Sequence, residues 1–268
     1  MLTSVYIENN KKAPLHYLEK LPSFENGKEY LFKPGINIII GPNGCGKSTL
    51  LNLISSFLFC ERGMVSKIPN SVLEYPRIFN DKLGETSILD GIKVHHDFRS
   101  ICFRYKPSME MNESEIMDNI QNFSVFLNGK SASTGEKTLE SLGYLFKELS
   151  NQKSYNFPIE ELKKLADNSN EVWKNRINNL LNYYEENRVK VTEEELEFTL
   201  LLDEPDRNLD IDNIESIYNI LSYQKPRTQI IAVVHNPVLI YKLSKLDYIN
   251  WIEIKKGYLN KIKRIIEI

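Results

Sequence analysis

The residues with the clearest chemical potential form a glycine-rich loop that ends in a lysine and two hydroxyl residues. Its nine members are Gly41, Pro42, Asn43, Gly44, Cys45, Gly46, Lys47, Ser48 and Thr49. Glycines at this spacing let the backbone curl with its N–H groups turned inward, which makes a cradle for a phosphate. Lys47 would add positive charge at the β- and γ-phosphates of a nucleotide, and the Ser48 hydroxyl is a suitable Mg²⁺ ligand. The pattern therefore predicts a nucleotide-phosphate site.

Two carboxylates and a histidine follow apolar runs later in the chain. Asp203 and Glu204 come directly after residues 198–202, and His235 follows residues 230–234. Because ligands of parallel α/β sheets bind at the carboxyl ends of the strands, both runs point to one site. We expect Asp203 to orient Mg²⁺, Glu204 to act as general base on the attacking water, and His235 to reach that water or the γ-phosphate. Taken singly, a solvated acidic loop and a polar strand end are the ordinary alternatives.

The glycine loop needs a strand before it and a helix after it, and the sequence supplies both. Residues 36–40 are a β-branched run typical of a buried parallel strand, and residues 47–59 have helical apolar spacing. Residues 91–96 and 101–105 are expected to pair as a small antiparallel patch. The remaining predicted elements are strands at 5–7, 30–32, 198–202 and 229–234, a hairpin of strands at 249–254 and 258–262, and helices at 113–120, 135–149, 159–166, 171–186, 211–221 and 238–243.

This order of elements predicts an α/β fold in a single domain. A core at about residues 1–110 and 196–268 would contain a parallel sheet and an N-terminal antiparallel β patch. A helical lobe would be inserted at about residues 111–195. Its last part, residues 151–195, is predicted to be an α-hairpin, which serves either as a dock for a partner or as a structural strut.

Composition narrows the class of protein. Hydrophobic residues make up 41% of the 268 residues and charged residues 26%, which is ordinary for a globular chain. The formal net charge of -2 gives no global support for nucleic-acid binding. The sequence shows no apolar signal core at its start and no run near the ~18 apolar residues that span a bilayer, so we expect no direct membrane insertion. Three cysteines without C-x-x-C spacing favour a reducing compartment and a cytoplasmic location.

In combination, these motifs resemble those of the ABC-type P-loop ATPase superfamily, and the chain is most similar to its small soluble SMC/RecF-like members. Residues 41–49 look like the Walker A motif, 200–205 the Walker B motif, 208–210 the D-loop and His235 the switch histidine. Residues 131–137 are similar to the signature motif, although Thr134 stands where the first signature glycine is usual.

The resemblance implies a P-loop NTPase fold, with an ABC-type mixed sheet core, an N-terminal antiparallel β patch and an inserted helical lobe. It implies ATP and Mg²⁺ as cofactors, with Lys47, Glu204 and His235 catalytic and with Ser48 and Asp203 at the metal. It also implies a homodimer with two ATP molecules sandwiched between the protomers. Residues Ser133, Gly135 and Glu136 would join residues 41–49 in holding the nucleotide, from the opposite protomer.

Membership of that branch further implies an ATP-driven switch that controls DNA or a partner effector such as a nuclease, in genome maintenance or phage defence. The alternative is the nucleotide-binding subunit of an ABC transporter. The alternative is weakened because residues 95–108, where the glutamine of a Q-loop should fall, contain no glutamine.

Several residues keep two interpretations at this stage. Cys45 is either a small loop residue or a redox-active thiol, and Ser133 is compatible with both a helix N-cap and a phosphate contact. Tyr17, Phe24 and Tyr30 are candidates for stacking on adenine or for the core. Five basic residues near the C-terminus would either guard a β-edge or bind DNA, namely Lys255, Lys256, Lys261, Lys263 and Arg264.

Overall fold

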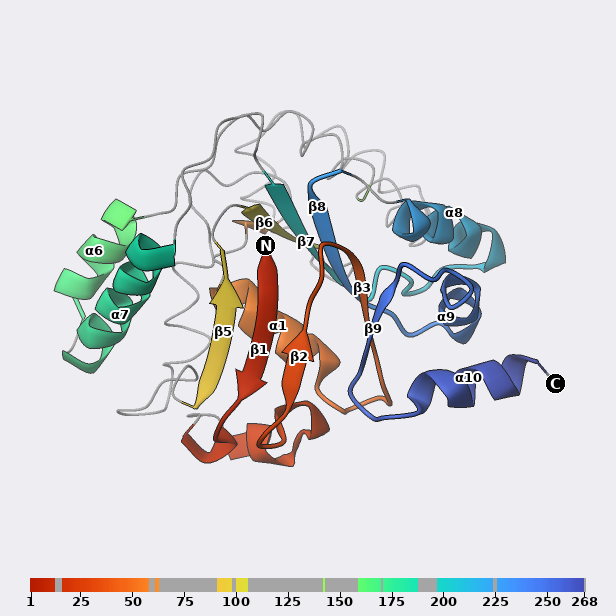
Figure 1. Ribbon diagram of the computed structural model, residues 1–268, viewed down its shortest axis with the longest axis horizontal. Coiled ribbons are helices and arrows are strands. Elements are labelled where there is room, and N and C mark those ends of the chain that lie inside the picture. Colours follow the sequence, from red (N-terminus) through yellow and green to blue (C-terminus); the bar gives the residue numbers. More distant parts are fainter. Residues whose placement is uncertain are drawn as a thin grey trace.

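The computed structural model describes residues 1–12, 16–57, 61–62, 91–97, 100–105, 142, 159–169, 171–187, 197–223 and 226–267. These residues form two sheets and the helices around them (Figure 1). The larger sheet has six parallel strands in the order β4-β6-β7-β8-β3-β9. Their bounds are β3 Gly35–Ile40, β4 Glu61–Arg62, β6 Ser100–Tyr105, β7 Glu197–Asp203, β8 Thr228–Val233 and β9 Asn250–Glu253.

Alternating side chains of the parallel sheet enter two apolar clusters, one on each face. On one face, Ile39, Leu201 and Ile231 pack with α1 (Lys47–Phe57) and with strands of the second sheet. On the other face, Ile38 and Leu200 pack with α8 (Ile211–Ser222), α9 (Pro237–Leu243) and α10 (Tyr258–Ile266). Because both faces are covered, the central strands β3, β7 and β8 are mainly apolar, as parallel strands buried on two sides usually are.

The smaller sheet is antiparallel, with the order β2-β1-β5. Its strands are β1 (Leu2–Ile7), β2 (Glu29–Leu31) and β5 (Ile92–His96). Between β1 and β2 lie three short 3-10 helices, at Asn10–Lys12, His16–Lys20 and Pro22–Phe24. The last of them contacts α1 and lies beneath the glycine loop.

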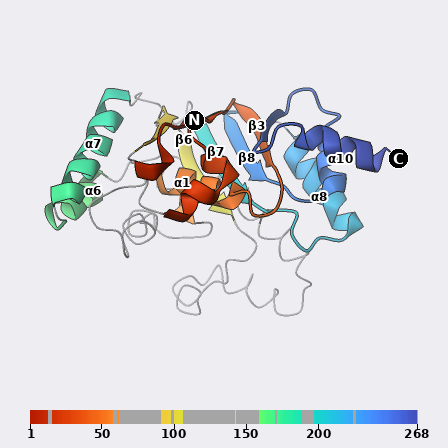
Figure 2. The same cartoon turned by 90° about the horizontal axis from the view of Figure 1, so that it is seen from below.

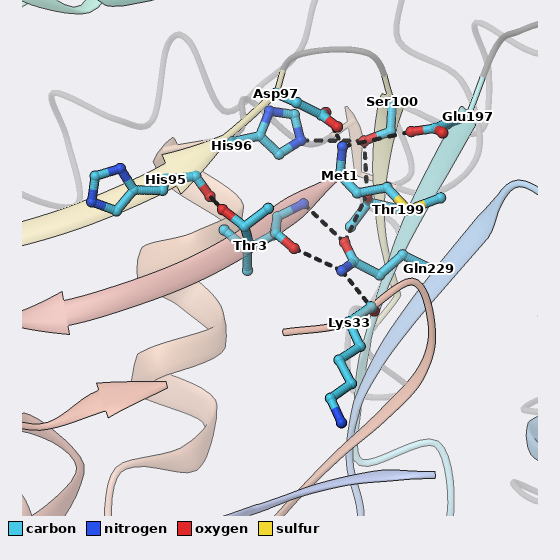
Figure 3. A network of polar contacts seen from close by, with 11 residues as sticks. Met1, Thr3, Lys33, His95, His96, Asp97, Ser100, Glu197, Thr199 and Gln229 are labelled. Carbon is cyan, nitrogen blue, oxygen red and sulfur yellow. Dashed lines mark hydrogen bonds and ion pairs between the residues drawn. The ribbon is translucent and has the colours of Figure 1, made fainter. Parts of the chain in front are cut away.

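The two sheets are joined by the side chain of Gln229, on β8 (Figure 3). Its Oε1 accepts a hydrogen bond from the backbone N–H of Leu2 at 2.9 Å, and its Nε2 donates to the carbonyl of Leu2 at 2.8 Å. The side-chain amide thus pairs with β1 as a peptide group of a neighbouring strand would. The hydroxyl of Thr199 lies beside it, 2.8 Å from the hydroxyl of Ser100, which in turn lies 3.2 Å from Nε2 of the buried His96.

The helical hairpin predicted at 159–186 is present as α6 (Ile159–Asp167) and α7 (Glu171–Asn187), which contact each other. Figures 1 and 2 both place α6 and α7 at one end of the molecule and α8 and α10 at the opposite end. Leu142 is helical and buried, within the helix expected at 135–149. The helix expected at 113–120 and the signature motif at 131–137 lie outside the described residues. That residues 111–195 form one inserted lobe therefore stays a prediction.

Two predicted pairings are wrong. Residues 91–96 and 101–105 do not form one patch, because β5 pairs antiparallel with β1 whereas β6 pairs parallel with β7. Residues 258–262 are not a hairpin strand but belong to α10, and β9 pairs only with β3 among the described strands. Gly257 takes a left-handed conformation before α10, with φ 81°, and Ile262 buries its side chain against α9 and the sheet. The basic residues 261, 263 and 264 therefore lie on a helix rather than on a β-edge.

Candidate nucleotide-binding site

The glycine loop lies between the carboxyl end of β3 and the first turn of α1, where backbone N–H groups of a helix start attract anions. Gly44 and Gly46 have left-handed φ values of 73° and 94°. Ser23 supports the loop from below, since its N–H donates to the carbonyl of Cys45 at 3.0 Å and its hydroxyl to that of Gly46 at 3.2 Å. A Cβ on Gly46 would overlap the Ser23 hydroxyl, so this close support requires glycine.

Lys47 is buried, and its ammonium group donates to two carbonyls of the loop, those of Gly41 at 2.9 Å and Pro42 at 3.0 Å. Burial lowers the pKa of Lys47 from its usual value, and nearby acidic groups, Glu204 and Asp203 among them, act in the opposite direction. Its charge is thus held inside the loop at a point where phosphate oxygens could replace the carbonyls.

Ser48 and Asp203 meet beside the loop. The Ser48 hydroxyl donates to Asp203 Oδ1 at 2.8 Å, and Asp203 is fully buried at the end of β7. Hydroxyl and carboxylate oxygens are the protein ligands and water-orienting groups that Mg²⁺ prefers, so this donor set fits that ion. Among the described residues, no three His, Cys, Asp or Glu side chains gather as a metal cluster. At nucleotide sites Mg²⁺ usually has one or two protein ligands and takes the others from phosphate and water, and Ser48 and Asp203 suit that role.

Glu204 and His235 face each other from the loops that follow β7 and β8. Glu204 Oε1 lies 3.3 Å from His235 Nε2, which has no hydrogen-bond partner in the part of the chain that the structure describes. The other ring nitrogen, Nδ1, lies 3.2 Å from Asn43 Oδ1. Burial, followed by the charge of Lys47, lowers the pKa of His235, which favours a neutral ring at pH 7. A carboxylate and a neutral imidazole at this separation can both hydrogen-bond to one water molecule that lies beside them.

Glu204 has an unusual backbone, because its φ is 56° although it is not glycine. Non-glycine residues rarely adopt this left-handed region, and such conformations gather at functional sites. The Glu204 side chain lines one pocket with glycine-loop residues and His235. Arg207 Nη1 approaches the same carboxylate at 3.5 Å.

These groups line one pocket of about 500 Å³ at the carboxyl edge of the parallel sheet. The lining residues are Leu21, Asn43, Gly44, Gly46, Lys47, Ser48, Thr49, Glu204, Asp206, Arg207 and His235. The structure thus brings the glycine loop together with Glu204 and His235, and Asp203 joins them through its contact with Ser48. The predicted contacts at Ser133, Gly135 and Glu136 lie outside the described residues.

Three pocket residues have no counterpart in the sequence-based prediction: Leu21, Asp206 and Arg207. Leu21 precedes the 3-10 helix that supports the loop, and no local pattern marks it. Asp206 and Arg207 directly follow Asp203-Glu204-Pro205. This closeness in sequence to the acidic pair could have predicted that they border the same pocket.

Phe24 and Tyr30 are not platforms for adenine, because both are buried in the core and neither lines the pocket. The hydroxyl of Tyr30 donates to the carbonyl of Ser23 at 2.8 Å, which places this tyrosine beneath the loop support. The Tyr17 side chain is outside the described part of the structure.

Cys45 is a buried free thiol, which agrees with the interpretation of a small residue packed in the loop. Cys102, on β6, is disulfide-bonded, which differs from the expectation of free thiols in a reducing compartment. Among the residues that the structure describes, none of the helices combines the length and apolarity that a bilayer-spanning segment requires.

Comparison with known proteins identifies one family. A family model described as AAA domain matches residues 17–267, which include the glycine loop, the acidic pair and His235. The comparison with curated proteins finds no match.

Proposed function

The chain belongs to the AAA-domain family of P-loop ATPases that is typical of SMC/RecF-like proteins, and from that membership we propose that it binds Mg-ATP in the 500 Å³ pocket and hydrolyses it. The observation that carries the proposal is the convergence of Lys47, Glu204 and His235 on this pocket, from segments far apart in the sequence. A phosphate cradle alone would support binding. A carboxylate and a neutral imidazole facing that cradle support a reaction with water as well.

In the proposed reaction, Lys47 exchanges its contacts with the loop carbonyls for oxygens of the β- and γ-phosphates. Ser48 and Asp203 would hold Mg²⁺, which supplies positive charge against the phosphates when it is bound. Glu204 accepts a proton from water as the water oxygen bonds to the γ-phosphorus and the bond to the ADP oxygen breaks. His235, whose Nε2 lies 3.3 Å from Glu204 Oε1, would hydrogen-bond to the same water and orient it. The products are ADP and phosphate.

The test measures nucleotide binding and phosphate release separately. Glu204→Gln should keep ATP binding and lose turnover by about 10²-fold or more, because general base catalysis contributes on that order. Lys47→Ala should lose binding. Asn250→Ala is a suitable control, because it removes two hydrogen bonds at the amino end of β9, at the opposite edge of the sheet. Turnover of Glu204→Gln at the parental rate would refute the assignment of the base, and a parent that binds no ATP would refute the proposed function.

The ATP-dependent homodimer is a further part of the proposal. Its support is the resemblance of the motifs, and Ile211 offers a way to test it: this residue, at the start of α8 and four positions after the pocket residue Arg207, is 72% exposed. A single exposed apolar side chain is common on monomeric proteins, so Ile211 is a position for testing the dimer rather than evidence for it. Sedimentation of Glu204→Gln should show a dimer with Mg-ATP and a monomer with ADP, and Ile211→Lys should prevent the dimer without weakening nucleotide binding. A Glu204→Gln protein that stays monomeric in Mg-ATP would contradict the sandwich with Ser133, Gly135 and Glu136.

For the biological role, we propose that the protein is an ATP-dependent switch that controls DNA or an effector protein. We propose no direct insertion of this chain into a membrane. The Glu204→Gln protein, purified from its native host in Mg-ATP with and without nuclease, should carry either a soluble effector or nuclease-sensitive DNA. Co-purification of a polytopic membrane protein would instead support the nucleotide-binding subunit of a transporter.

A further inference from the structure

Asp206 is a buried carboxylate at the pocket to which the proposed reaction gives no task. Its exposed fraction is 5%, and it lines the pocket three positions after Asp203. One oxygen, Oδ2, accepts hydrogen bonds from two consecutive backbone N–H groups, that of His235 at 2.8 Å and that of Asn236. Asp206 therefore connects the loop after β7 to the turn after β8.

A second contact connects the same two segments. The N–H of Glu204 donates to the carbonyl of Val233 at 3.1 Å, at the end of β8. Together with the Asp206 contacts, it fixes the loop that carries Glu204 to the turn that carries His235 at two separate points. Glu204 and His235, whose Oε1 and Nε2 lie 3.3 Å apart, are each a residue whose backbone N–H makes one of these contacts.

The second oxygen of Asp206, Oδ1, is buried and has no hydrogen-bond partner among the described residues. A buried carboxylate is costly unless it is hydrogen-bonded, so the position of Asp206 depends on the amides of His235 and Asn236. Burial raises the pKa of Asp206, while its hydrogen bonds from the Asn236 and His235 amides oppose that change. A buried carboxylate held in this way at the border of an active site indicates a functional role.

We propose that Asp206 is a positioning residue, whose carboxylate holds the His235 turn against the Glu204 loop and so sets the distance between the two groups that bind the attacking water. The inference rests on the proposed function, since it assumes that Glu204 and His235 act on a nucleotide. Asp206 itself touches neither water nor phosphate in this scheme and acts through His235.

The experiment compares kcat and KM for Mg-ATP in Asp206→Ala, Asp206→Asn, His235→Ala and the Asp206→Ala/His235→Ala double variant. Asp206→Ala should lower kcat on the order of 10²-fold, the cost of a displacement near 1 Å, and change KM little. Asp206→Asn should keep most of the activity, because its amide oxygen can accept the same two N–H bonds. In the His235→Ala background, Asp206→Ala should cause no further loss, because a residue that acts through His235 has nothing left to position.

Hydrogen exchange at the amides of His235 and Asn236 gives a readout that is independent of turnover, and it should be faster in Asp206→Ala but not in the control Asn250→Ala. The proposal is overturned by parental kcat in Asp206→Ala, by an additive loss in the double variant, or by an Asp206→Asn protein as inactive as Asp206→Ala. These outcomes all occur with an active parent. A parent without ATP turnover would instead refute the proposed function, and the inference with it.

Discussion

The Ser48 hydroxyl donates a 2.8 Å hydrogen bond to Asp203 Oδ1 across 155 positions of sequence. It is the contact that joins the glycine loop to the acidic strand end. Because both oxygens are proposed to hold Mg²⁺, Ser48→Ala should raise the Mg²⁺ concentration for half-maximal turnover by about tenfold or more. Phosphate release measured over a magnesium titration checks this, with nucleotide binding in EDTA as the control that should not change. An unchanged magnesium dependence would remove Ser48 from the metal site.

The left-handed backbone of Glu204 predicts an inverted order of stability between two variants. At ordinary positions alanine is more stabilising than glycine, but at a φ of 56° an alanine retains the steric cost that glycine avoids. Glu204→Gly should therefore be more stable than Glu204→Ala by about 1 kcal/mol in urea unfolding. The same pair at Glu215, an exposed position within α8, should show the usual order. If alanine is the more stable residue at both positions, the left-handed conformation is not maintained in solution.

Substitutions at two glycines of the loop, Gly44 and Gly46, can distinguish the cost of steric overlap from the cost of backbone strain. Both Gly44 and Gly46 have left-handed φ values, but only at Gly46 would a Cβ overlap Ser23 and lie 3.2 Å from Leu21 Cβ. Gly46→Ala should therefore lose about 1–3 kcal/mol more unfolding free energy than Gly44→Ala. It should also weaken nucleotide binding more, because the loop must shift away from its support. Equal losses in the two variants would show that the 3-10 helix at Pro22–Phe24 does not support the loop.

Buried His96 predicts a pH dependence of stability. Burial, with a smaller contribution from the Met1 ammonium group, lowers the pKa of His96 to about 3, well below the value of about 6.5 in an unfolded chain. The unfolded state then binds the extra proton, so this stability is present above pH 6.5 and is lost as the pH falls, by up to about 1.4 kcal/mol per pH unit. Urea unfolding of the parent and of His96→Gln between pH 5 and 8 should show a shallower slope for the variant. Identical slopes would mean that His96 is accessible to protons in the folded protein.

The parts of the site that the sequence predicts correctly are those whose residue types and spacing are enough to indicate their chemistry. The glycine loop, the acidic pair and His235 each follow a strand that its own β-branched or apolar run reveals. Strand pairing is different, because the partner of a strand is set by packing across the whole domain. The pairing of β6 with β7, about ninety residues later, leaves no mark in either strand, so neighbourhood in the chain suggested the wrong partner.

The helix α10 shows a second limit of predicting structure from sequence. A short run with Lys256-Gly257 before it suits a hairpin turn, and a short apolar segment does not distinguish a strand from a helix. What decides the outcome is the face on which Tyr258, Leu259 and Ile262 pack, against α9 and the parallel sheet. Asp206 shows a third limit, because its importance comes from two amides about thirty residues away.

The pairing of Gln229 with Leu2 has a mechanical consequence. The strand β8 ends at the turn of His235, and near its beginning the Gln229 side chain attaches it to the first residue of β1, the central strand of the antiparallel sheet. A shift of β8 along its axis would have to break two hydrogen bonds to Leu2 or carry β1 with it. Under the proposed function, a displacement of the His235 turn along β8 would therefore be coupled to β1 of the antiparallel sheet through the two hydrogen bonds between Gln229 and Leu2.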